Sequence, residues 1–198
     1  MLTVIIPSLN SESTLVPVFS ALVPASAEGV VKEVIVVDAG SNDKTAEIAD
    51  ACGALWLEHS GTVGERVSFA VSHATRGEWL MFLSPAAVLD ASWTGEFTAF
   101  TDRLARIGRL NKMAATFSYR SEDFGWKPRL RERSLSLSTQ LFAKPSDMQG
   151  LLLSKALYDA HGGHDHSARS GVVSLKRPLK RSELKQLASC ATDFSAIA

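Results

Sequence analysis

The first residue whose type and position could support chemistry is Asp38, which directly follows four β-branched residues. Residues Val34 to Val37 are all apolar, and Asp38 leads into the small-residue turn Ala-Gly-Ser-Asn-Asp. A continuous apolar run of this kind predicts a strand buried on both faces, as in a parallel sheet. Ligands of open α/β sheets bind outside the carboxyl ends of the strands. Asp38 is therefore a candidate ligand-binding carboxylate, and capping of the following helix is its alternative role.

The elements that must position Asp38 alternate between strands and helices over the first hundred residues. Strands are predicted at Leu2 to Ile6 (ended by Pro7), Val34 to Val37, Ala54 to Glu58, Glu78 to Leu83 and Lys112 to Tyr119. The intervening helices are predicted to run through Val23 (with a loop from Pro24 to Gly29), from Asn42 or Asp43 to Ala51, around Val67 to Ala74, and from Trp93 to Ile107. This alternation predicts an α/β fold with a mostly parallel sheet and helices on both faces, in a single domain.

The second half of the chain has a weaker pattern. The elements predicted there are a basic amphipathic helix at Lys127 to Phe142, a strand at Gln149 to Leu153, a short helix at Ser154 to Ala160 that stops at Gly162-Gly163, and a last helix at Ser182 to Ala188. We therefore divide the chain into a domain over residues 1–165 and a basic C-terminal tail over residues 166–198 with one short helix.

Composition narrows the function classes. The chain has 198 residues, 45% of them hydrophobic, and a formal net charge of zero, so no overall positive field favours nucleic acid. Cys52 and Cys190 lie far apart and lack metal-ligand spacing, which is typical of reduced thiols in a cytoplasmic protein. We find no signal peptide and no apolar run approaching the roughly 20 residues of a membrane span. We expect a soluble, cytoplasmic protein.

Three segments of the sequence are similar to those of a known enzyme family. They are Val4-Ile-Ile-Pro-Ser-Leu-Asn-Ser-Glu12, Val34-Ile-Val-Val-Asp-Ala-Gly-Ser-Asn-Asp-Lys-Thr45 and Ala74-Thr-Arg-Gly-Glu-Trp-Leu-Met-Phe-Leu83. The chain resembles family-2 glycosyltransferases, which use nucleotide-sugar donors. The resemblance implies a GT-A-like (Rossmann-like) fold over about residues 1–165.

Within that family, the chain is most similar to a compact subgroup, the rSAM/selenodomain-associated transferase 2 type. Gly64-Glu-Arg66 matches the Gly-Arg-Ala segment of the subgroup, and Ser146 to Gly150 echoes its Gly-Asp-Gln-Gly segment. Gly162-Gly-His164 stands where the subgroup has Gly-Gly-Phe.

The resemblance implies a set of nucleotide-binding residues. These are Pro7, Leu9, Asn10, Glu12, Asp38, Gly40, Ser41, Arg66 and Ser84. Asp38 is expected to accept hydrogen bonds from a uracil ring, and Glu12 to hold a ribose hydroxyl. Arg66 is expected to meet the base or the diphosphate, since a guanidinium pairs with phosphate bidentately; a solvated cation on a helix face is the alternative.

The sequence departs from the family where a metal ion would bind. The family holds a divalent cation, Mn2+ or Mg2+, with an Asp-x-Asp motif, but the matching residues here are Ser84-Pro85-Ala86. Asp90 follows too late to substitute and is expected to cap the next helix. No acidic pair with a general base follows Gly163, which leaves Asp147 as the candidate catalytic base or positioning carboxylate.

Three groups of residues leave further alternatives open. The basic run of Arg120, Lys127, Arg129, Arg131 and Arg133 could neutralise a diphosphate without metal, or simply be a solvated helix face. His161, His164, Asp165 and His166 could hold a metal, although they lack a second ligand group elsewhere. Lys176, Arg177, Lys180, Arg181 and Lys185 could bind a polyanion or serve as a solubilising surface.

The predicted function is transfer of a sugar from a UDP- or GDP-sugar to an unknown acceptor hydroxyl. The alternative is a catalytically degenerate GT-A domain that has lost the Asp-x-Asp motif and binds a nucleotide or a partner. A nucleotidyltransferase fits less well, because Pro7 to Asn10 is not a Gly-rich phosphate loop. We expect no nucleic-acid partner and no transmembrane segment, and leave a homodimer open.

Overall fold

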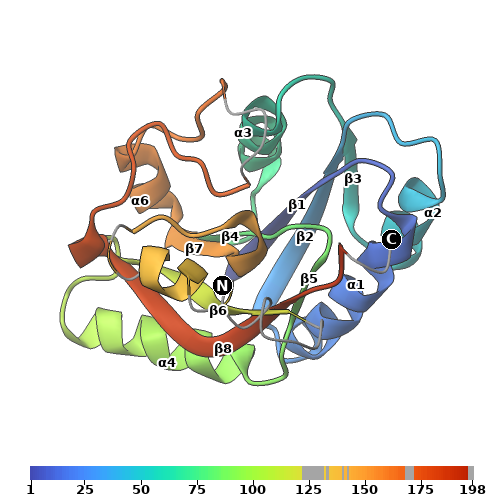
Figure 1. Cartoon of the computed structure of the whole chain (residues 1–198). Helices are drawn as coiled ribbons and strands as arrows, with labels where there is room; N and C mark the ends of the chain where they lie inside the picture. Colours follow the sequence, from blue (N-terminus) through green and yellow to red (C-terminus); the bar gives the residue numbers. More distant parts are fainter. Residues whose placement is uncertain (122–131, 133, 140, 142, 168–171, 196–198) are drawn as a thin grey trace.

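The computed structural model describes residues 1–121, 132, 134–139, 141, 143–167 and 172–195. Its elements are β1 (Leu2–Ser8), α1 (Glu12–Ala27), β2 (Val31–Asp38), α2 (Thr45–Ala51), β3 (Leu55–Glu58), α3 (Val63–His73), β4 (Trp79–Phe82), β5 (Ala87–Leu89), α4 (Trp93–Arg106), β6 (Ala114–Ser121), η1 (Asp147–Gln149), β7 (Leu151–Ser154), α6 (Lys155–Ala160), η2 (Arg181–Glu183) and β8 (Leu184–Asp193) (Figure 1). Half of the predicted helix from Lys127 to Phe142 lies outside the described residues, and its described residues, 132, 134–139 and 141, are helical.

One mixed sheet joins all eight strands in the order β3-β2-β1-β4-β7-β6-β8-β5. The strands β3, β2, β1 and β4 are parallel, β7 runs antiparallel to β4 and β6, and β8 runs parallel to β6 and antiparallel to β5. The predicted α/β fold is therefore confirmed, with the parallel part of the sheet confined to the N-terminal half and to the pair β6–β8.

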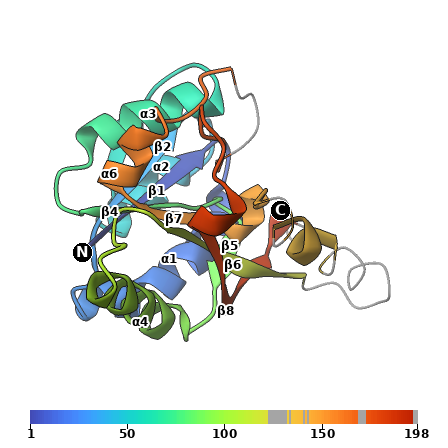
Figure 2. The same cartoon turned by 90° about the vertical axis from the view of Figure 1, so that its left-hand side faces the viewer.

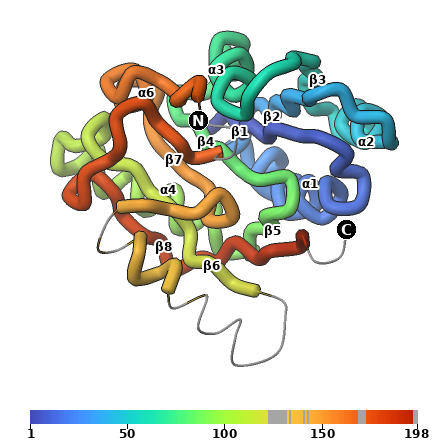
Figure 3. The backbone as a smooth tube through the Cα atoms, turned by 45° about the horizontal axis from the view of Figure 1, so that its top comes forward, coloured from blue at the N-terminus to red at the C-terminus, as the bar shows by residue number. Residues whose placement is uncertain are grey.

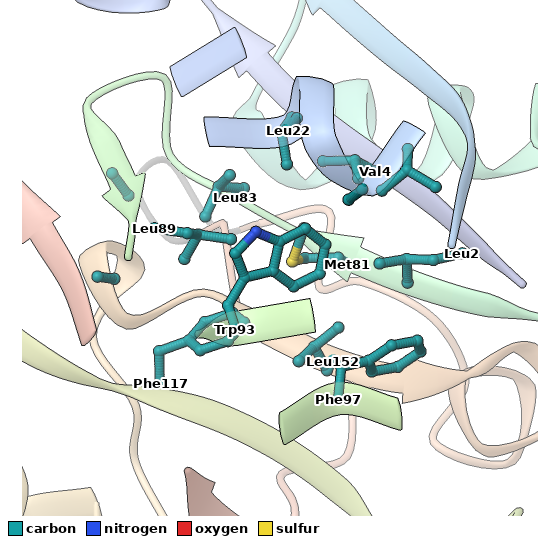
Figure 4. Close-up of a cluster of buried hydrophobic side chains, with 14 of the residues drawn as sticks. Leu2, Val4, Leu22, Met81, Leu83, Leu89, Trp93, Phe97, Phe117 and Leu152 are labelled. Carbon is teal, nitrogen blue, oxygen red and sulfur yellow. The ribbon is translucent and has the colours of Figure 1, made fainter. Parts of the chain in front are cut away.

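Helices cover both faces of the sheet (Figure 2). The larger apolar cluster lies between the sheet and α1 and α4, and the second lies between the sheet and α3 and α6. Figure 4 shows Trp93 at the centre of the larger cluster, among Leu89, Phe117 and Met81. Trp93 is 1% exposed, and its indole N–H donates to the carbonyl of Ala21 at 3.2 Å, so this side chain ties α4 to α1.

Two predicted boundaries near the N-terminus are wrong, and both involve proline. β1 continues through Pro7 to Ser8, because the nitrogen of Pro7 faces the side of β4, which has already ended opposite Ile5. A missing N–H therefore breaks no ladder bond there. α1 continues to Ala27 with Pro17 and Pro24 inside it. Neither proline belongs to the buried stripe of α1 (Leu15, Val18, Phe19, Leu22 and Ala25), and the burial of that stripe stabilises the helix through both positions.

The predicted helix from Ser182 to Ala188 is also wrong. After the short turn η2, the chain forms the ten-residue strand β8, which pairs with β6 and with the unpredicted strand β5. The segment that we assigned to a separate tail thus contributes a strand to the common sheet, side by side with β6 (Figures 1 and 3).

Two carboxylates accept hydrogen bonds from β8 where its pairing with β6 is irregular. The register with β6 shifts between Thr116 and Ser118. Near this shift, the carboxylate of Glu96 accepts hydrogen bonds from the N–H and Oγ of Ser189, at 2.9 and 2.7 Å. Asp90 accepts from the N–H of Cys190 at 2.6 Å, so α4 and its leading turn supply the acceptors that the shifted strand needs.

The strand pair also depends on these carboxylates being charged. Burial alone would raise the pKa of Glu96, but the hydrogen bonds from Ser189 outweigh it and lower the pKa below its ordinary value. The pKa of Asp90 is lowered in the same way by Cys190 and Ser92 against the effect of burial.

The loop after α6 packs directly on the start of α3. The Oγ1 of Thr62 donates to the carbonyl of His166 at 2.6 Å, and the Nε2 of His166 lies 3.1 Å from the Oγ of Ser68. A Cβ built on Gly64 would lie 1.9 Å from the carbonyl oxygen of Asp165. Gly64 is therefore required by a close backbone approach between two segments a hundred residues apart.

Replacing Glu96 with Gln should destabilise the fold in a pH-dependent way. A carboxyl whose pKa is lowered by folding stabilises above its unfolded pKa, and this contribution is lost as the pH falls through its folded pKa. We expect a loss of about 1 kcal/mol at pH 7, discounted for solvent screening, that shrinks toward zero near pH 3. Urea unfolding at both pH values measures it, with Glu28→Gln at the exposed end of α1 as the control. An equal loss at both pH values would contradict the charged role.

The substitution Gly64→Ala should destabilise the protein by roughly 1–3 kcal/mol, because the added methyl group collides with backbone. The matched control is Gly95→Ala in α4, where a Cβ meets nothing within 4 Å. There the gain in helix propensity should leave stability unchanged or raise it by up to ~1 kcal/mol. Thermal unfolding of both variants compares the two sites, and equal effects would show that the approach of Asp165 to Gly64 is unimportant.

Candidate functional site

The carboxyl ends of β1, β2 and β4 form the edge at which the candidate residues gather. Ser8, the last residue of β1, pairs in register with Asp38, the last residue of β2. β4 ends beside them, with the N–H of Leu83 donating to the carbonyl of Ile5 at 3.0 Å. Because β7 is antiparallel to β4 and pairs Leu151 with Phe82, the turn η1 before β7 reaches the same edge.

Asp38 has the predicted position at the end of its strand, but its carboxylate is engaged by its own turn. The side chain is fully buried, and it accepts from the N–H groups of Gly40 and Ser41 at 2.7 and 2.5 Å and from the Oγ of Ser41 at 2.6 Å. Gly40 adopts a φ of 99°, a conformation that favours glycine. A carboxylate has about four acceptor positions, so three bonds leave capacity for a further donor.

The predicted site residues join the loop after β1 to the loop after β2 by hydrogen bonds. The N–H of Asn10 donates to the Oγ of Ser41 at 2.7 Å, and the Oδ1 of Asn10 accepts from the N–H of Asn42 at 3.0 Å. Glu12 accepts from the N–H of Lys44 at 2.8 Å, at the start of α2. These residues therefore hold the two loops together, while the side chain of Leu9 is 53% exposed beside them.

Arg66 joins α3 to the same edge. Its side chain is 7% exposed, and its Nη1 donates to the carbonyl of Ser8 at 2.7 Å. The Nε of Arg66 and the Oγ of Ser8 are buried, and neither has a hydrogen-bond partner in the described part of the chain. Burial lowers the pKa of Arg66 and the nearby charge of Asp38 raises it, with a net lowering. A solvated helix-face cation, the alternative role for Arg66, is excluded by its burial.

The turn after β4 offers no carboxylate. Ser84 and Ala86 are each 8% exposed, and the Oγ of Ser84 accepts from the N–H of Ala86 at 3.4 Å. Asp90 lies beyond β5, where its carboxylate accepts from Ser92 and Cys190. The capping role expected for Asp90 is therefore wrong: the N-cap residue of α4 is Ser92, no described side chain caps the helix, and Asp90 bonds Ser92 and the strand β8 instead. Within the described residues, no three or more His, Cys, Asp or Glu side chains are grouped so that they could hold a metal ion.

Asp147 lies in η1, partly buried. Its Oδ1 accepts from the N–H of Val173 at 3.4 Å, and burial raises the pKa of its carboxyl above the ordinary value. Val173 also lines a hollow of about 340 Å³, together with Lys144, Asp165 and Ser174. Asp147 thus bonds a residue that lines this surface hollow.

The histidines near Gly163 have separate environments. His164 is fully buried, with Nδ1 3.1 Å from the hydroxyl of Tyr158 and Nε2 2.9 Å from the carbonyl of Val172. Burial lowers its pKa to about 4, so this ring is neutral at pH 7. His161 contacts the carbonyl of Arg177, and His166 contacts Ser68. The metal site considered for this cluster is therefore not supported.

Sequence reasoning missed Ser8 as a site residue. Its only signal was its place between Pro7 and Leu9, because its register with Asp38 and its contact with Arg66 arise from pairing across 30 and 58 positions of the chain. Four of the five cations in the predicted basic run, Lys127, Arg129, Arg131 and Arg133, lie outside the described residues.

Comparison with known proteins gives a family and a set of structural neighbours. The sequence profile of Glycosyl transferase family 2 matches residues 3–93, which include Asp38, Arg66 and the turn at Ser84. No curated protein matches the chain. The family profile does not name the rSAM-associated subgroup, which stays a prediction.

The structural neighbours share the fold at low sequence identity. A crystal structure of TarS residues 1–349 from S. aureus superposes with a TM-score of 0.70 and 16% identity, over 96% of this chain and 60% of that chain. Glucosyl-3-phosphoglycerate synthase from Mycobacterium tuberculosis, in complex with Mn2+ and UDP-glucose, superposes with a TM-score of 0.64 and 19% identity, over 98% of this chain and 70% of that one. The chain thus spans about 60% of the TarS fragment, less than two thirds of it.

In the described part of the chain, no helix combines the length and the hydrophobicity needed to cross a membrane. The match over residues 3–93 confirms the resemblance to family-2 glycosyltransferases, carried on the GT-A-like α/β fold that the structural neighbours share.

Proposed function

We propose that this chain transfers a sugar from a nucleotide-sugar donor, a UDP- or GDP-sugar, to an acceptor hydroxyl. The observation that carries the proposal is the placement of Asp38, Arg66 and Asp147 along one edge of the sheet, from β2, α3 and η1. The family match and the UDP-glucose complex of a structural neighbour support it.

The donor nucleoside would lie over the interlocked loops after β1 and β2. Asp38 keeps acceptor capacity for an N–H of the base, and the exposed side chain of Leu9 offers an apolar surface for the ring. The backbone around Pro7 frames the base, and Glu12 faces the ribose in this arrangement. Gly40 and Ser41 fix the carboxylate of Asp38 before the ligand arrives, which reduces the cost of ordering the site.

The acceptor would enter beside Asp147. As the acceptor oxygen attacks the anomeric carbon of the sugar, Asp147 takes the hydroxyl proton, and the bond from that carbon to the donor phosphate oxygen breaks. The electron pair leaves with the nucleoside diphosphate. A carboxylate whose pKa is raised by burial is suited to this task, since a general base works best when its pKa approaches the operating pH.

The hollow of about 340 Å³ next to Asp147 has the size of a small-molecule site and mixed polar and apolar walls. Lys144 and Asp165 place opposite charges on that lining. We assign this hollow to the acceptor.

The second candidate function, a degenerate domain that binds a nucleotide without turnover, is favoured by Ser84-Pro85-Ala86 in place of Asp-x-Asp. It predicts the same nucleotide site and no reaction, so binding and turnover must be measured separately.

Thermal unfolding with UDP, GDP and their sugars tests the binding half of the proposal. A nucleotide held at 100 times its dissociation constant should stabilise the fold by about 2.7 kcal/mol. Asp38→Ala should remove that shift, and Asp50→Ala on the exposed surface of α2 should keep it. No shift with any nucleotide would overturn the proposal, and a shift that survives in Asp38→Ala would overturn the role of Asp38.

Slow hydrolysis of the donor tests the catalytic half, since water can replace the unknown acceptor. Asp147→Asn should lower hydrolysis by roughly 100-fold or more while the nucleotide-induced thermal shift stays intact. Asp102→Asn on α4 is the control. A nucleotide-induced shift in the unmodified protein without any hydrolysis would support the degenerate alternative instead.

A further inference from the structure

A buried cation at the sheet edge has a neutral hydrogen-bond acceptor. In the described part of the chain, Arg66 is the only lysine or arginine that is buried. Its one hydrogen-bond acceptor among the described residues is the neutral carbonyl of Ser8, which also accepts the N–H of Ala39 at 3.1 Å. Burying a cation is costly unless an anion and full hydrogen bonding compensate for it.

The carboxylate of Asp38 offsets the charge of the Arg66 guanidinium but does not accept a hydrogen bond from its Nε. Asp38 lowers the energy of the guanidinium through its charge, but both of its oxygens already accept from Gly40 and Ser41. Although Asp38 has capacity for a further donor, the Nε of Arg66 has no hydrogen-bond partner among the described residues. The buried Oγ of Ser8, which is 1% exposed, has none there either. An unpartnered donor on a buried guanidinium suits an anionic oxygen. The Oγ of Ser8 does not share this position, because Ser8 follows Val4 and Ile6 on the face of β1 toward α1, whereas α3 covers the other face.

The residues at the metal position of the family do not fit a divalent cation. Mg2+ and Mn2+ prefer carboxylate and other oxygen ligands. The turn offers one hydroxyl, that of Ser84, which faces the N–H of Ala86, and the side chains of Pro85 and Ala86 carry no polar atom.

We propose that this chain binds the diphosphate of its nucleotide without a metal ion, and that Arg66 supplies the positive charge that a cation supplies in relatives with the Asp-x-Asp motif. The inference rests on the proposed function, because it concerns the phosphates of the same donor. A phosphate oxygen would accept from the Nε of Arg66 and give this buried donor its missing partner. As the sugar leaves, the same guanidinium would stabilise the charge that develops on the departing diphosphate.

Calorimetric titration of the full chain with UDP, UMP and uridine, each in EDTA and in Mn2+, tests the inference on the unmodified protein. We expect UDP to bind in EDTA with an affinity within about threefold of that in Mn2+, and more tightly than uridine. UDP binding that requires Mn2+ would overturn the inference and leave the proposed function standing. If neither UDP nor uridine binds, and GDP and guanosine titrated in the same way do not bind either, the proposed function itself fails. Equal affinities for UDP and uridine would overturn the phosphate-binding role.

Arg66→Gln identifies the group responsible. It should weaken UDP roughly 10- to 100-fold and leave uridine within about threefold. Arg76→Gln, at an exposed position before β4, is the matched control and should change neither affinity. An Arg66→Gln protein that loses UDP and uridine equally would overturn the assignment. If that variant does not fold, the EDTA and Mn2+ titrations of the unmodified chain decide the matter alone.

Discussion

The parallel pairing of β1 with β2 up to Ser8 and Asp38 is the constraint on which the candidate site depends. It sets two chain segments side by side just where both leave the sheet, so that the following loops can bond each other through Asn10, Ser41 and Glu12. It also places the carbonyl of Ser8 where Arg66 can reach it from α3. The edge is thus built from residues far apart in the chain. β1 lies between β2 and β4 in the sheet, so its end contacts both neighbouring segments.

The two candidate carboxylates of the site are positioned differently: Asp38 by its own turn, and Asp147 by contacts with another segment. Asp38 is fixed by three hydrogen bonds from its own turn. Asp147 owes its position to η1 and to the N–H of Val173. Asp165, after α6, approaches Gly64 closely, which connects the wall of the acceptor hollow to the helix that carries Arg66.

The N-terminal half of the fold could be predicted because its signals are local. Four apolar runs and the helices between them follow simple periodicity, and Asp38 stands where a buried strand meets a glycine-containing turn. β8 could not be predicted in this way, since Ser182 to Ala188 has residues of good helix propensity and becomes a strand only because β6 and β5 offer partners. The burial of Arg66 and the orphaned Oγ of Ser8 likewise depend on tertiary contacts that spacing along the chain does not encode.

The proposed site places the nucleotide at the edge formed by β1 and β2 and neutralises its diphosphate with Arg66. A crystal structure of the protein grown with UDP in the presence of EDTA tests this most directly. We predict density for the diphosphate beside the guanidinium of Arg66, with the base near Asp38 and Leu9. Density for UDP at the opposite edge of the sheet, in the hollow of about 630 Å³ lined by Arg76 and Lys155, would contradict it.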